Sequence, residues 1–246
     1  MSGAIEAALA AELAPTGVLR VGINLGNPVI VQADPAGGEL RGVGPALGRE
    51  FARRCGLSIA FVTFETAGKM ADAVKAGAWD AAFLAVDPAR ATDIEFAPAY
   101  VHIEGTYLVA EASPLRAVAD ADREGIRIAV GLKTAYDLYL TREIRRASLV
   151  RAGSSIAAIE QFVREKLDAV AGVRQPLQTY AAGHAGHRVL GDSFMVIRQA
   201  AGVPKGRLAA ARHLARFIEE AKRSGFVAQA LRESGQAEVT IAPAAS

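Results

Sequence analysis

Arg90 is the residue of this sequence whose type and position are best suited to chemistry. It follows an apolar run over 81–86, which predicts a buried strand, and a break at Asp87-Pro88. In open α/β sheets, ligands bind beyond the carboxyl ends of the strands. A guanidinium at such a place can hold a carboxylate through two parallel hydrogen bonds. We therefore expect Arg90 to bind an anionic group. The alternative is a surface ion pair with Asp87 or Asp93, which would contribute little stability.

A second feature suited to anion binding is Thr134-Ala135-Tyr136-Asp137, which has the Ser/Thr-x-x-Asp/Glu form of a capping box. The pattern predicts a helix start, whose free N–H groups attract anions. The plainest interpretation is a helix cap with no ligand, and this interpretation is compatible with a binding role. We expect Arg90 and this helix start to act on one carboxylate.

Other motifs give little support for catalysis, a cofactor or a metal. Gly42-x-Gly44-x-x-x-Gly48 is one residue too long for a dinucleotide loop and follows a polar loop instead of a strand. His184 and His187 lack a third ligand nearby. Cys55 is expected on an apolar helix face with Leu47 and Phe51, as a core residue. We predict no catalytic residue, no cofactor and no metal.

Composition places the chain among ordinary globular proteins. It has 246 residues, 51% hydrophobic and 22% charged, with 28 basic against 26 acidic residues and a net charge of +2. The basic residues are spread along the chain, so nothing indicates a nucleic-acid partner. No apolar run is long enough to span a bilayer, so we expect no membrane insertion.

The first 110 residues alternate between strand and helix patterns. The expected elements are a helix over 3–14, a strand over 18–24, a helix from Pro45 through Cys55, a strand over 58–64, a helix over 68–76, and strands over 81–86 and 103–110. This β-α-β-α-β order predicts a mostly parallel sheet flanked by helices.

A second run of the same kind follows the break at Ser113-Pro114. Its expected elements are strands over 126–130, 149–151, 168–172 and 193–197, and helices over 134–147, 155–166 and 204–224. Apolar spacing places two sets of side chains in the core: Ile156, Ile159 and Val163 in one helix, and Leu208, Ala211, Leu214, Ile218 and Ala221 in the long one.

Two α/β runs in series predict two lobes with a cleft between them. We assign residues 1–110 plus 194–246 to lobe one and 111–193 to lobe two. The two crossings, near Glu111 and Ser193, would act as hinges, and closure on a ligand is the expected motion.

Short motifs recur in a fixed order along nearly the whole chain. They are Leu19-Arg20-Val21-Gly22-Ile23, Gly38-Glu39-Leu40-Arg41-Gly42, Asp87-Pro88-Ala89-Arg90, Phe96-Ala97-Pro98-Ala99-Tyr100, Val130-Gly131-Leu132-Lys133-Thr134, Asp168-Ala169-Val170 and Ser224-Gly225-Phe226. In this order they resemble the family 3 solute-binding proteins, the amino-acid receptors of ABC transporters. The resemblance implies a two-lobed α/β fold of the type II periplasmic-binding-protein kind, which binds a small ligand reversibly in the cleft between its lobes.

The resemblance also implies roles for single residues. Arg90 matches the carboxylate-binding arginine of the family, and Thr134 matches the hydroxyl residue that assists it. The ligand-binding residues expected on this basis are Asn27, Ala85, Asp87, Arg90, Lys133, Thr134, Ala135 and Arg174.

Several positions depart from the family pattern. Asn27 stands where a stacking aromatic is common, and Ala82 and Ala85 stand where hydroxyl residues often line the pocket. Val173 stands where an Asp usually binds the α-ammonium group. Without that Asp, a keto, hydroxy or aromatic acid lacking the amine fits at least as well as an amino acid.

Other residues leave the ligand open. Asp87 or Asn27 could take the place of the missing ammonium partner. Lys133 and Arg174 could favour a second acidic group on the ligand.

By the resemblance, the partners are a small-molecule carboxylate and an ABC permease. We expect a monomer located in the periplasm. The first fifteen residues carry Glu6 and Glu12 and no basic region, so they do not form a secretory signal peptide, and a cytoplasmic location stays open.

Two other functions remain alternatives. One is an enzyme resembling cyclohexadienyl dehydratase, in which Tyr136 stands at the position of the acid, with Asp137 adjacent. The other is a cytoplasmic ligand-sensing module.

Overall fold

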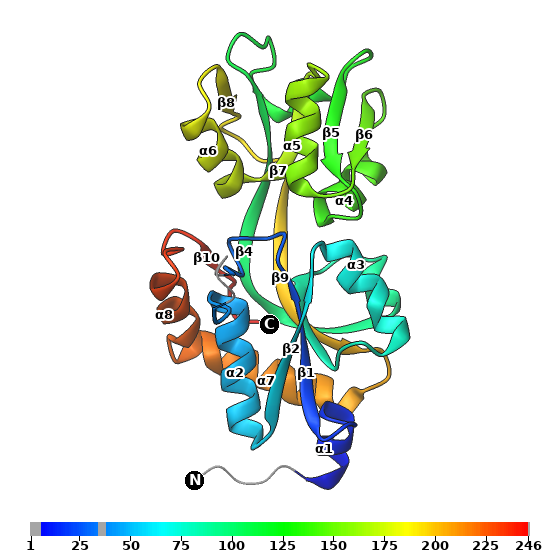
Figure 1. The fold of residues 1–246 in the computed structure, drawn as a ribbon, viewed down its shortest axis with the longest axis vertical. Coiled ribbons are helices and arrows are strands. Elements are labelled where there is room, and N and C mark those ends of the chain that lie inside the picture. Colours follow the sequence, from blue (N-terminus) through cyan, green and yellow to red (C-terminus); the bar gives the residue numbers. More distant parts are fainter. Residues whose placement is uncertain (1–5, 34–37, 246) are drawn as a thin grey trace. The chain divides into compact units, whose positions relative to one another are not determined.

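The structure, a computed structural model, describes residues 6–33 and 38–245 of the chain (Figure 1). The chain divides into two compact units. Unit 1 comprises Met1–His102 and Arg198–Ser246, and unit 2 comprises Ile103–Ile197. Both boundaries fall inside long strands, β4 (Ile94–Ala110) and β9 (Met195–Pro204), instead of at the loop positions near Glu111 and Ser193. The sequence pattern predicted only 103–110 of the first strand, after the break at Pro98, and only 193–197 of the second.

The sheet of unit 1 is built on three parallel strands, β1 (Val18–Asn24), β2 (Ser58–Phe64) and β3 (Ala81–Ala85). Strand β1 pairs in parallel with β2 and with β3, and Gly22 lies opposite Ala82. Strand β9 adds to β3 in the antiparallel sense, and β10 (Thr240–Ile241) pairs antiparallel with β4. The sheet is therefore mixed, with a parallel centre.

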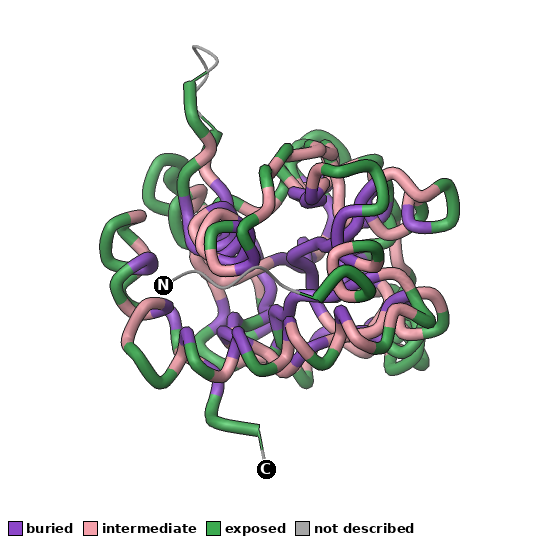
Figure 2. The backbone as a smooth tube through the Cα atoms, turned by 90° about the horizontal axis from the view of Figure 1, so that it is seen from below, coloured by how far each residue is buried: buried purple, intermediate pink, exposed green. Residues whose placement is uncertain are grey.

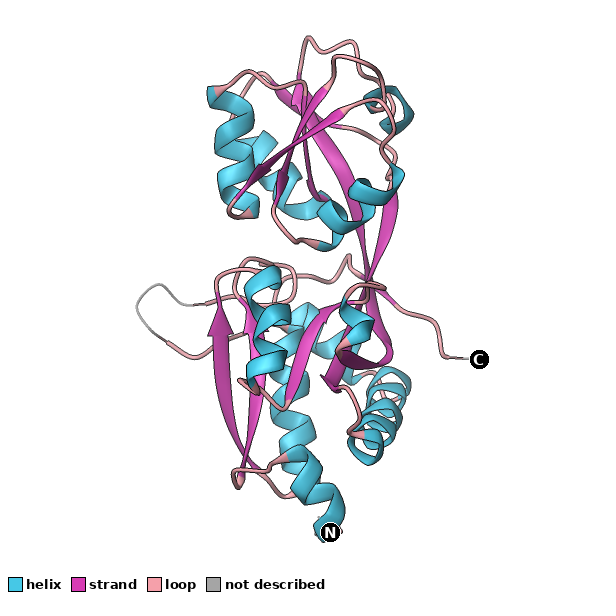
Figure 3. Cartoon of the chain, turned by 90° about the vertical axis from the view of Figure 1, so that its right-hand side faces the viewer, coloured by secondary structure: helices cyan, strands magenta, loops and turns pink. Residues whose placement is uncertain are grey.

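Helices flank this sheet, as Figure 3 shows. Helices α2 and α3 both pack against β1 and β2, and α1 packs against α7. The helical segments of unit 1 are α1 (Ala7–Leu13), α2 (Val43–Cys55), α3 (Ala67–Asp72), the 3-10 turns η1 (Ala73–Ala76) and η2 (Arg90–Thr92), α7 (Leu208–Arg223) and α8 (Phe226–Glu233). The start of the first helix predicted over 3–14 lies outside the described residues.

Unit 2 repeats the arrangement on a smaller scale. Strand β5 (Arg127–Gly131) pairs in parallel with β6 (Ser148–Ala152) and β7 (Ala169–Val173). The second half of β4 pairs antiparallel with β7 and with β8 (His187–Val189). Its helical segments are η3 (Val118–Ala121), α4 (Ala135–Glu143), α5 (Ser155–Arg164) and α6 (Arg174–Gly183).

Each unit buries its own core, and Figure 2 colours the backbone by burial, with buried segments in purple and exposed segments in green. In unit 1, Trp79, Met70 and Leu84 pack together, and the Trp79 indole donates to the Met70 carbonyl at 2.9 Å. In unit 2, Leu108 and Phe162 pack with Val170 and Leu177. Burial of such side chains is the main driving force for folding.

Two predictions of inward-facing side chains were wrong. In α5, Ile156 is 69% exposed and Val163 is 44% exposed, whereas Ala158 and Phe162 are buried. In α7, Leu208 is 53% exposed, while Leu214, Ile218 and Ala221 are buried as expected. Both helices carry apolar residues on more than one face, and the aromatic Phe162, which fills more volume than an aliphatic chain, decides which face of α5 turns inward.

Helix α4 is shorter than the predicted span over 134–147. It ends at Glu143, and Ile144 is already extended, with ψ at 131°. The sequence pattern also did not predict α6 or β8. Within the described part of the chain, no helix combines the length and apolar character that a membrane crossing requires.

Candidate functional site

The carboxyl end of β3 carries the first half of the candidate site. Strand β3 is buried along its whole length, and Asp87 and Arg90 follow it directly. The Asp87 carboxylate accepts a hydrogen bond from the Ala89 N–H at 2.8 Å, and the Asp87 carbonyl accepts one from the Arg90 N–H at 3.0 Å. These bonds fold the chain into the turn η2. The turn brings the Arg90 side chain back over the end of the strand, where its Nη1 donates to the Ala85 carbonyl at 2.9 Å.

Arg90 is an unusually buried arginine. Only 5% of its surface is exposed. Burial lowers the pKa of Arg90 to about 10, against the opposing effect of the nearby carboxylates of Asp87 and Asp72. The guanidinium therefore stays charged at neutral pH. Its planar group carries five N–H donors, which suit it to a carboxylate.

Asn27 lies at the end of β1, the strand next to β3. Its carbonyl accepts hydrogen bonds from the N–H groups of Ile30 and Val31 at 3.1 and 3.0 Å, which closes a turn. Its side-chain oxygen Oδ1 is buried and has no hydrogen-bond partner among the described residues. Because Gly22 of β1 lies opposite Ala82 of β3, the two strands end side by side, and Asn27 and Arg90 lie at the same edge of unit 1.

The glycines at the start of α2 have a packing role. A Cβ on Gly42 would lie 2.4 Å from the Ile30 carbonyl oxygen, and φ at Gly42 is +108°. A Cβ on Gly44 would lie 3.0 Å from the Ile30 side chain, and the Gly44 N–H bonds the Ile30 carbonyl at 3.1 Å. The close approach of two backbone segments therefore accounts for this glycine pattern without a phosphate.

The start of α4 carries the second half of the candidate site, in unit 2. The Thr134 hydroxyl accepts from the Asp137 N–H at 3.1 Å and donates to the Gly131 carbonyl at 2.8 Å. The sequence-predicted cap is therefore formed. Ala135 and Tyr136 follow as the first two helical residues, and both are buried. The N–H groups at these two positions have no acceptor in a preceding helical turn, so they are available to an anion.

Lys133 precedes this helix start in a left-handed conformation, with φ at +56°. A side chain other than glycine rarely adopts this conformation, which costs on the order of 1–2 kcal/mol. Its N–H donates to the Asp137 carboxylate at 2.8 Å, and the residue is exposed. The bond helps to hold the turn, which places a cation beside the amino end of α4.

Asp137 has three protein partners, which bear on whether it could act as an acid. Besides the Lys133 N–H, its carboxylate binds Arg151 Nε at 2.8 Å and lies 3.4 Å from the Thr141 hydroxyl. Only 3% of Asp137 is exposed. These partners engage the carboxylate within unit 2, so it is not free to approach a ligand as an acid.

Arg174 follows β7 and is held by its own unit. It forms an ion pair with Glu104 and donates to the carbonyls of Leu190 at 3.0 Å, Gly191 at 3.2 Å and Asp192 at 2.9 Å. Glu104 lies 70 residues before Arg174 in the sequence. These contacts tie the end of β7 to the segment before β9.

Two residues near the candidate site were missed by the sequence analysis. Ser155 begins α5, and its Oγ lies 2.7 Å from the Tyr136 hydroxyl. Gln175 follows Arg174, and its Oε1 is buried without a hydrogen-bond partner in the described part of the chain. Ser154 caps α5, and its hydroxyl accepts from the Ala157 N–H at 3.1 Å. A serine at a helix start is a sequence sign that could have located Ser155. Gln175 has no comparable sequence sign.

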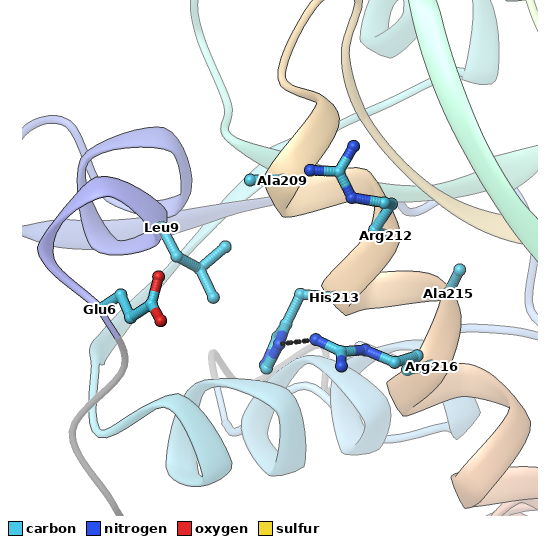
Figure 4. Close-up of a pocket in the computed structure, with 7 residues that line it drawn as sticks. All are labelled: Glu6, Leu9, Ala209, Arg212, His213, Ala215 and Arg216. Atoms are coloured by element: carbon cyan, nitrogen blue, oxygen red, sulfur yellow. Dashed lines mark hydrogen bonds between the residues drawn. The ribbon is translucent and has the colours of Figure 1, made fainter.

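A cavity of about 700 Å³ lies elsewhere in unit 1, between α1 and α7 (Figure 4). Its lining residues are Glu6, Leu9, Ala209, Arg212, His213, Ala215 and Arg216. Arg216 lies 3.3 Å from His213 Nδ1. Helix α1 leads into the amino end of β1, so this cavity lies at the opposite end of the strand from Asn27.

The histidine pair of unit 2 is occupied by local contacts. The His184 ring stacks on Tyr180, with centroids 4.0 Å apart, and His187 packs edge-on against the same ring. Across the described ranges, no cluster of three or more His, Cys, Asp or Glu side chains is arranged to hold a metal ion. Cys55 is buried, and burial raises its pKa to about 11, so the thiol stays protonated at neutral pH.

Comparison with models of known protein families identifies the family of this chain. Residues 19–235 match the model of the bacterial extracellular solute-binding proteins, family 3. The chain belongs to this family. As a family 3 solute-binding protein, it has the two-unit α/β architecture expected from its motifs, with mixed sheets flanked by helices. A search of the curated proteins gives no match.

Solved structures of several other proteins share this fold. A cysteine-binding protein from Campylobacter jejuni superimposes with a TM-score of 0.80 at 18% identity, covering 97% of this chain and 100% of the other. An ancestral amino-acid-binding protein, AncCDT-1, described as a precursor of cyclohexadienyl dehydratase, gives 0.75 at 19% identity, with coverages of 90% and 96%. A histidine kinase sensor domain with similarity to periplasmic binding proteins gives 0.78 at 17% identity, with coverages of 92% and 98%.

Proposed function

We propose that this chain binds a small carboxylate ligand reversibly between its two units, as the substrate-binding component of an ABC transporter. The observation that carries the proposal is the burial of Arg90 at the carboxyl end of β3. Burying a guanidinium is costly, and pairing with an anion offsets that cost. The carboxylates of Asp87 and Asp72 supply part of this charge, and the ligand carboxylate adds to it by accepting two parallel hydrogen bonds from the guanidinium.

Unit 2 contributes the start of α4 to the same carboxylate. The N–H groups of Ala135 and Tyr136 and the positive end of the helix dipole suit a negative charge. The Thr134 hydroxyl donates to the Gly131 carbonyl, so it would have to turn to donate to the carboxylate. We keep Asn27, Ala85, Asp87, Arg90, Lys133, Thr134 and Ala135 as ligand-binding residues. Arg174 would reach the ligand only by leaving Glu104, so we assign it to support of the β7 end.

Ligand binding would close the two units about the crossings in β4 and β9. Because Arg90 belongs to unit 1 and Thr134 to unit 2, one carboxylate bound by both would favour the closed arrangement over others. We propose a periplasmic location, which the description of the family as extracellular supports, and a permease as the partner. We propose that the chain acts as a monomer.

An enzymatic role is the main alternative, because AncCDT-1 is described as a precursor of a dehydratase. The position expected for an acid holds Tyr136, whose pKa is raised by burial, and Asp137 is bound by Arg151. The raised pKa of Tyr136 makes its hydroxyl a weak acid, and the bond to Arg151 holds the Asp137 carboxylate within unit 2. We therefore propose binding without turnover. Prephenate or arogenate should be recovered unchanged after incubation with the protein.

A sensory role is the other alternative, because a histidine kinase sensor domain shares the fold. Neighbouring genes separate the two roles. Genes for a permease and an ATPase would support transport, and a signalling partner would support sensing.

A thermal-shift screen against small carboxylic acids tests the proposal. The panel includes amino acids and their keto and hydroxy analogues. We expect at least one acid to raise the melting temperature at millimolar concentration, because ligand that binds only the folded state stabilises it. Micromolar affinity corresponds to about −8 kcal/mol. A panel in which uncharged amides stabilise as well as the acids do would contradict a carboxylate site.

A further inference from the structure

Gln199 is exceptional among the buried Asp, Arg, Thr and Gln side chains that the structure describes. Only 5% of Gln199 is exposed. Its amide makes no hydrogen bond to another described residue. The other buried side chains of these types all have a hydrogen-bond partner within the protein: Asp80, Asp87, Arg90, Thr106, Thr134 and Asp137. A buried amide without a partner is destabilising, so this position favours a partner from outside the chain.

Gln199 lies on β9, beside the carboxyl end of β3. In the antiparallel register of the two strands it is paired with Ala85. The Val86 N–H donates to the Arg198 carbonyl at 2.9 Å, so the neighbouring pair is the hydrogen-bonded one. Ala85 and Gln199 therefore form a non-hydrogen-bonded pair, in which the two side chains share one face of the sheet and lie close together.

Arg90 reaches the same strand end from the other side of β3. Its Nη1 donates to the Ala85 carbonyl at 2.9 Å. In a non-hydrogen-bonded pair this carbonyl points away from the partner strand, so the guanidinium lies on the side of Ala85 that faces away from β9. Ala85 carries only a methyl group, so little side chain separates the guanidinium from the Gln199 amide. Both residues belong to unit 1, and their placement is independent of unit 2.

We propose that Gln199 is a further ligand-binding residue, whose Nε2 donates a hydrogen bond to the carboxylate that Arg90 binds. This inference rests on the proposed function and adds a residue to its site. The charge of Arg90 is balanced in part by Asp87 and Asp72, and it still favours a negative group on the ligand at this strand end. Nε2 is the atom of the amide that can bind such a group.

A carboxylate can bind both side chains at once. Its oxygens offer about four lone-pair positions, so it can accept from an amide while it accepts two bonds from a guanidinium. The same contact supplies the missing partner of the Gln199 amide, which stabilises the bound state further.

Calorimetry on Gln199→Met tests the contact. Methionine has a similar length and no amide. The probes are the protein amino acids, lactate, pyruvate, phenyllactate and phenylpyruvate, and the acid that binds the wild-type protein most tightly is used. We expect Gln199→Met to bind this acid about tenfold to a hundredfold more weakly, the effect of one hydrogen bond to a charged group. Gln178→Met, on the exposed surface of α6, is the matched control and should bind normally.

The melting temperature without ligand separates a binding role from a structural one. Gln199→Met removes a buried amide that has no partner, so the ligand-free protein should melt at the same temperature as the wild type or higher. A lower melting temperature combined with normal affinity would show that the amide serves the fold, and would overturn the inference.

Gln199→Glu tests the assignment of Nε2 as the donor, independently of stability. Glutamate keeps the side-chain length but replaces the donor with a carboxylate, which repels an acid and accepts from a primary amide. The affinity for the acid, divided by the affinity for its carboxamide, should fall at least about tenfold. An unchanged or increased ratio in this variant overturns the inference.

The outcomes separate this inference from the proposed function. Normal binding by both Gln199 variants, together with lost binding in Arg90→Ala, overturns the inference but leaves the carboxylate site in place. Failure of every acid of the panel to bind the wild-type protein overturns both.

Discussion

Two buried charges of unit 1 illustrate what single residues contribute. Arg90 lies beyond the end of β3, where a ligand can reach the edge of the sheet. Asp80 lies just before the amino end of the same strand and is 0% exposed. Arg20 binds it through Nε and Nη2, both at 2.8 Å, and Arg207 binds it through Nη1 at 3.0 Å. Asp80 therefore serves the fold, while Arg90 is placed to serve a ligand.

Substitution of Asp80 should destabilise the protein in a pH-dependent way. Burial alone would raise the pKa of Asp80, but hydrogen bonds from Arg20 and Arg207 outweigh it and hold the pKa below its usual value. A carboxyl of this kind stabilises the fold above its unfolded pKa of about 4, and this stabilisation is lost as the pH falls through the folded pKa. We expect Asp80→Asn to lower the free energy of unfolding by about 3 kcal/mol at pH 7.

Urea denaturation from pH 7 to pH 3 checks this prediction. The difference in the free energy of unfolding between the wild-type protein and Asp80→Asn should narrow below about pH 4. Asp93→Asn, at an exposed ion pair with Lys75, should change stability by less than about 0.5 kcal/mol. A difference that stays constant with pH would contradict the assigned role of Asp80.

At the residue scale, local patterns were readable from the sequence and distant pairings were not. The cap at Thr134 was predicted because its donor and acceptor lie three residues apart. The partner of Arg174 was not predicted, because Glu104 lies 70 residues away and the pairing depends on the register of β4 with β7. The same limit hid the unpartnered state of Asn27 Oδ1.

At the scale of elements, α5 shows how a helix with apolar residues on several faces is resolved by its neighbours. Phe162 and Ala158 pack against Leu108 and Val170, which lie on adjacent strands. Ile156 is left on the surface. The spacing of apolar residues and the composition predicted the helix and its start at Ser155. Which face of the helix turns inward depended on the sheet that it packs against.

Substitutions in α5 test this orientation. Phe162→Ala should lower the free energy of unfolding by about 3–5 kcal/mol, because it removes a large buried side chain. Ile156→Ala should change it by less than about 0.5 kcal/mol, because its side chain is already in water. Chemical denaturation of both variants provides the measurement. A larger cost for Ile156→Ala than for Phe162→Ala would show that the helix is turned the other way.

At the scale of the whole molecule, the division into two units follows from the order of the elements. Two α/β runs predicted two lobes, and the family 3 match gives the same architecture. The positions of the boundaries depended on the lengths of β4 and β9, which the pattern underestimated at the amino end of β4 and at the carboxyl end of β9. Antiparallel pairing of these strands could not be read from local spacing, since it follows from the route of the chain between the units.

The proposed closure predicts a change in the dimensions of the molecule. Small-angle X-ray scattering should show a smaller radius of gyration with a saturating ligand than without it, because the ligand favours the arrangement in which both units bind it. Arg90→Ala at the same ligand concentration should retain the larger radius. Identical scattering curves with and without bound ligand would contradict closure.

Calorimetry on Arg90 variants, with the tightest acid found in the screen, tests the central claim most directly. Loss of one partner of a buried charge pair costs roughly 2–5 kcal/mol, so Arg90→Ala should weaken binding about thirtyfold or more. Arg90→Lys, which keeps the charge but loses the planar fork, should recover part of the affinity. Arg212→Ala, in the cavity between α1 and α7, is the matched control and should bind normally. Unchanged affinity in a folded Arg90→Ala variant, or loss of binding in Arg212→Ala alone, would contradict a carboxylate site at the end of β3.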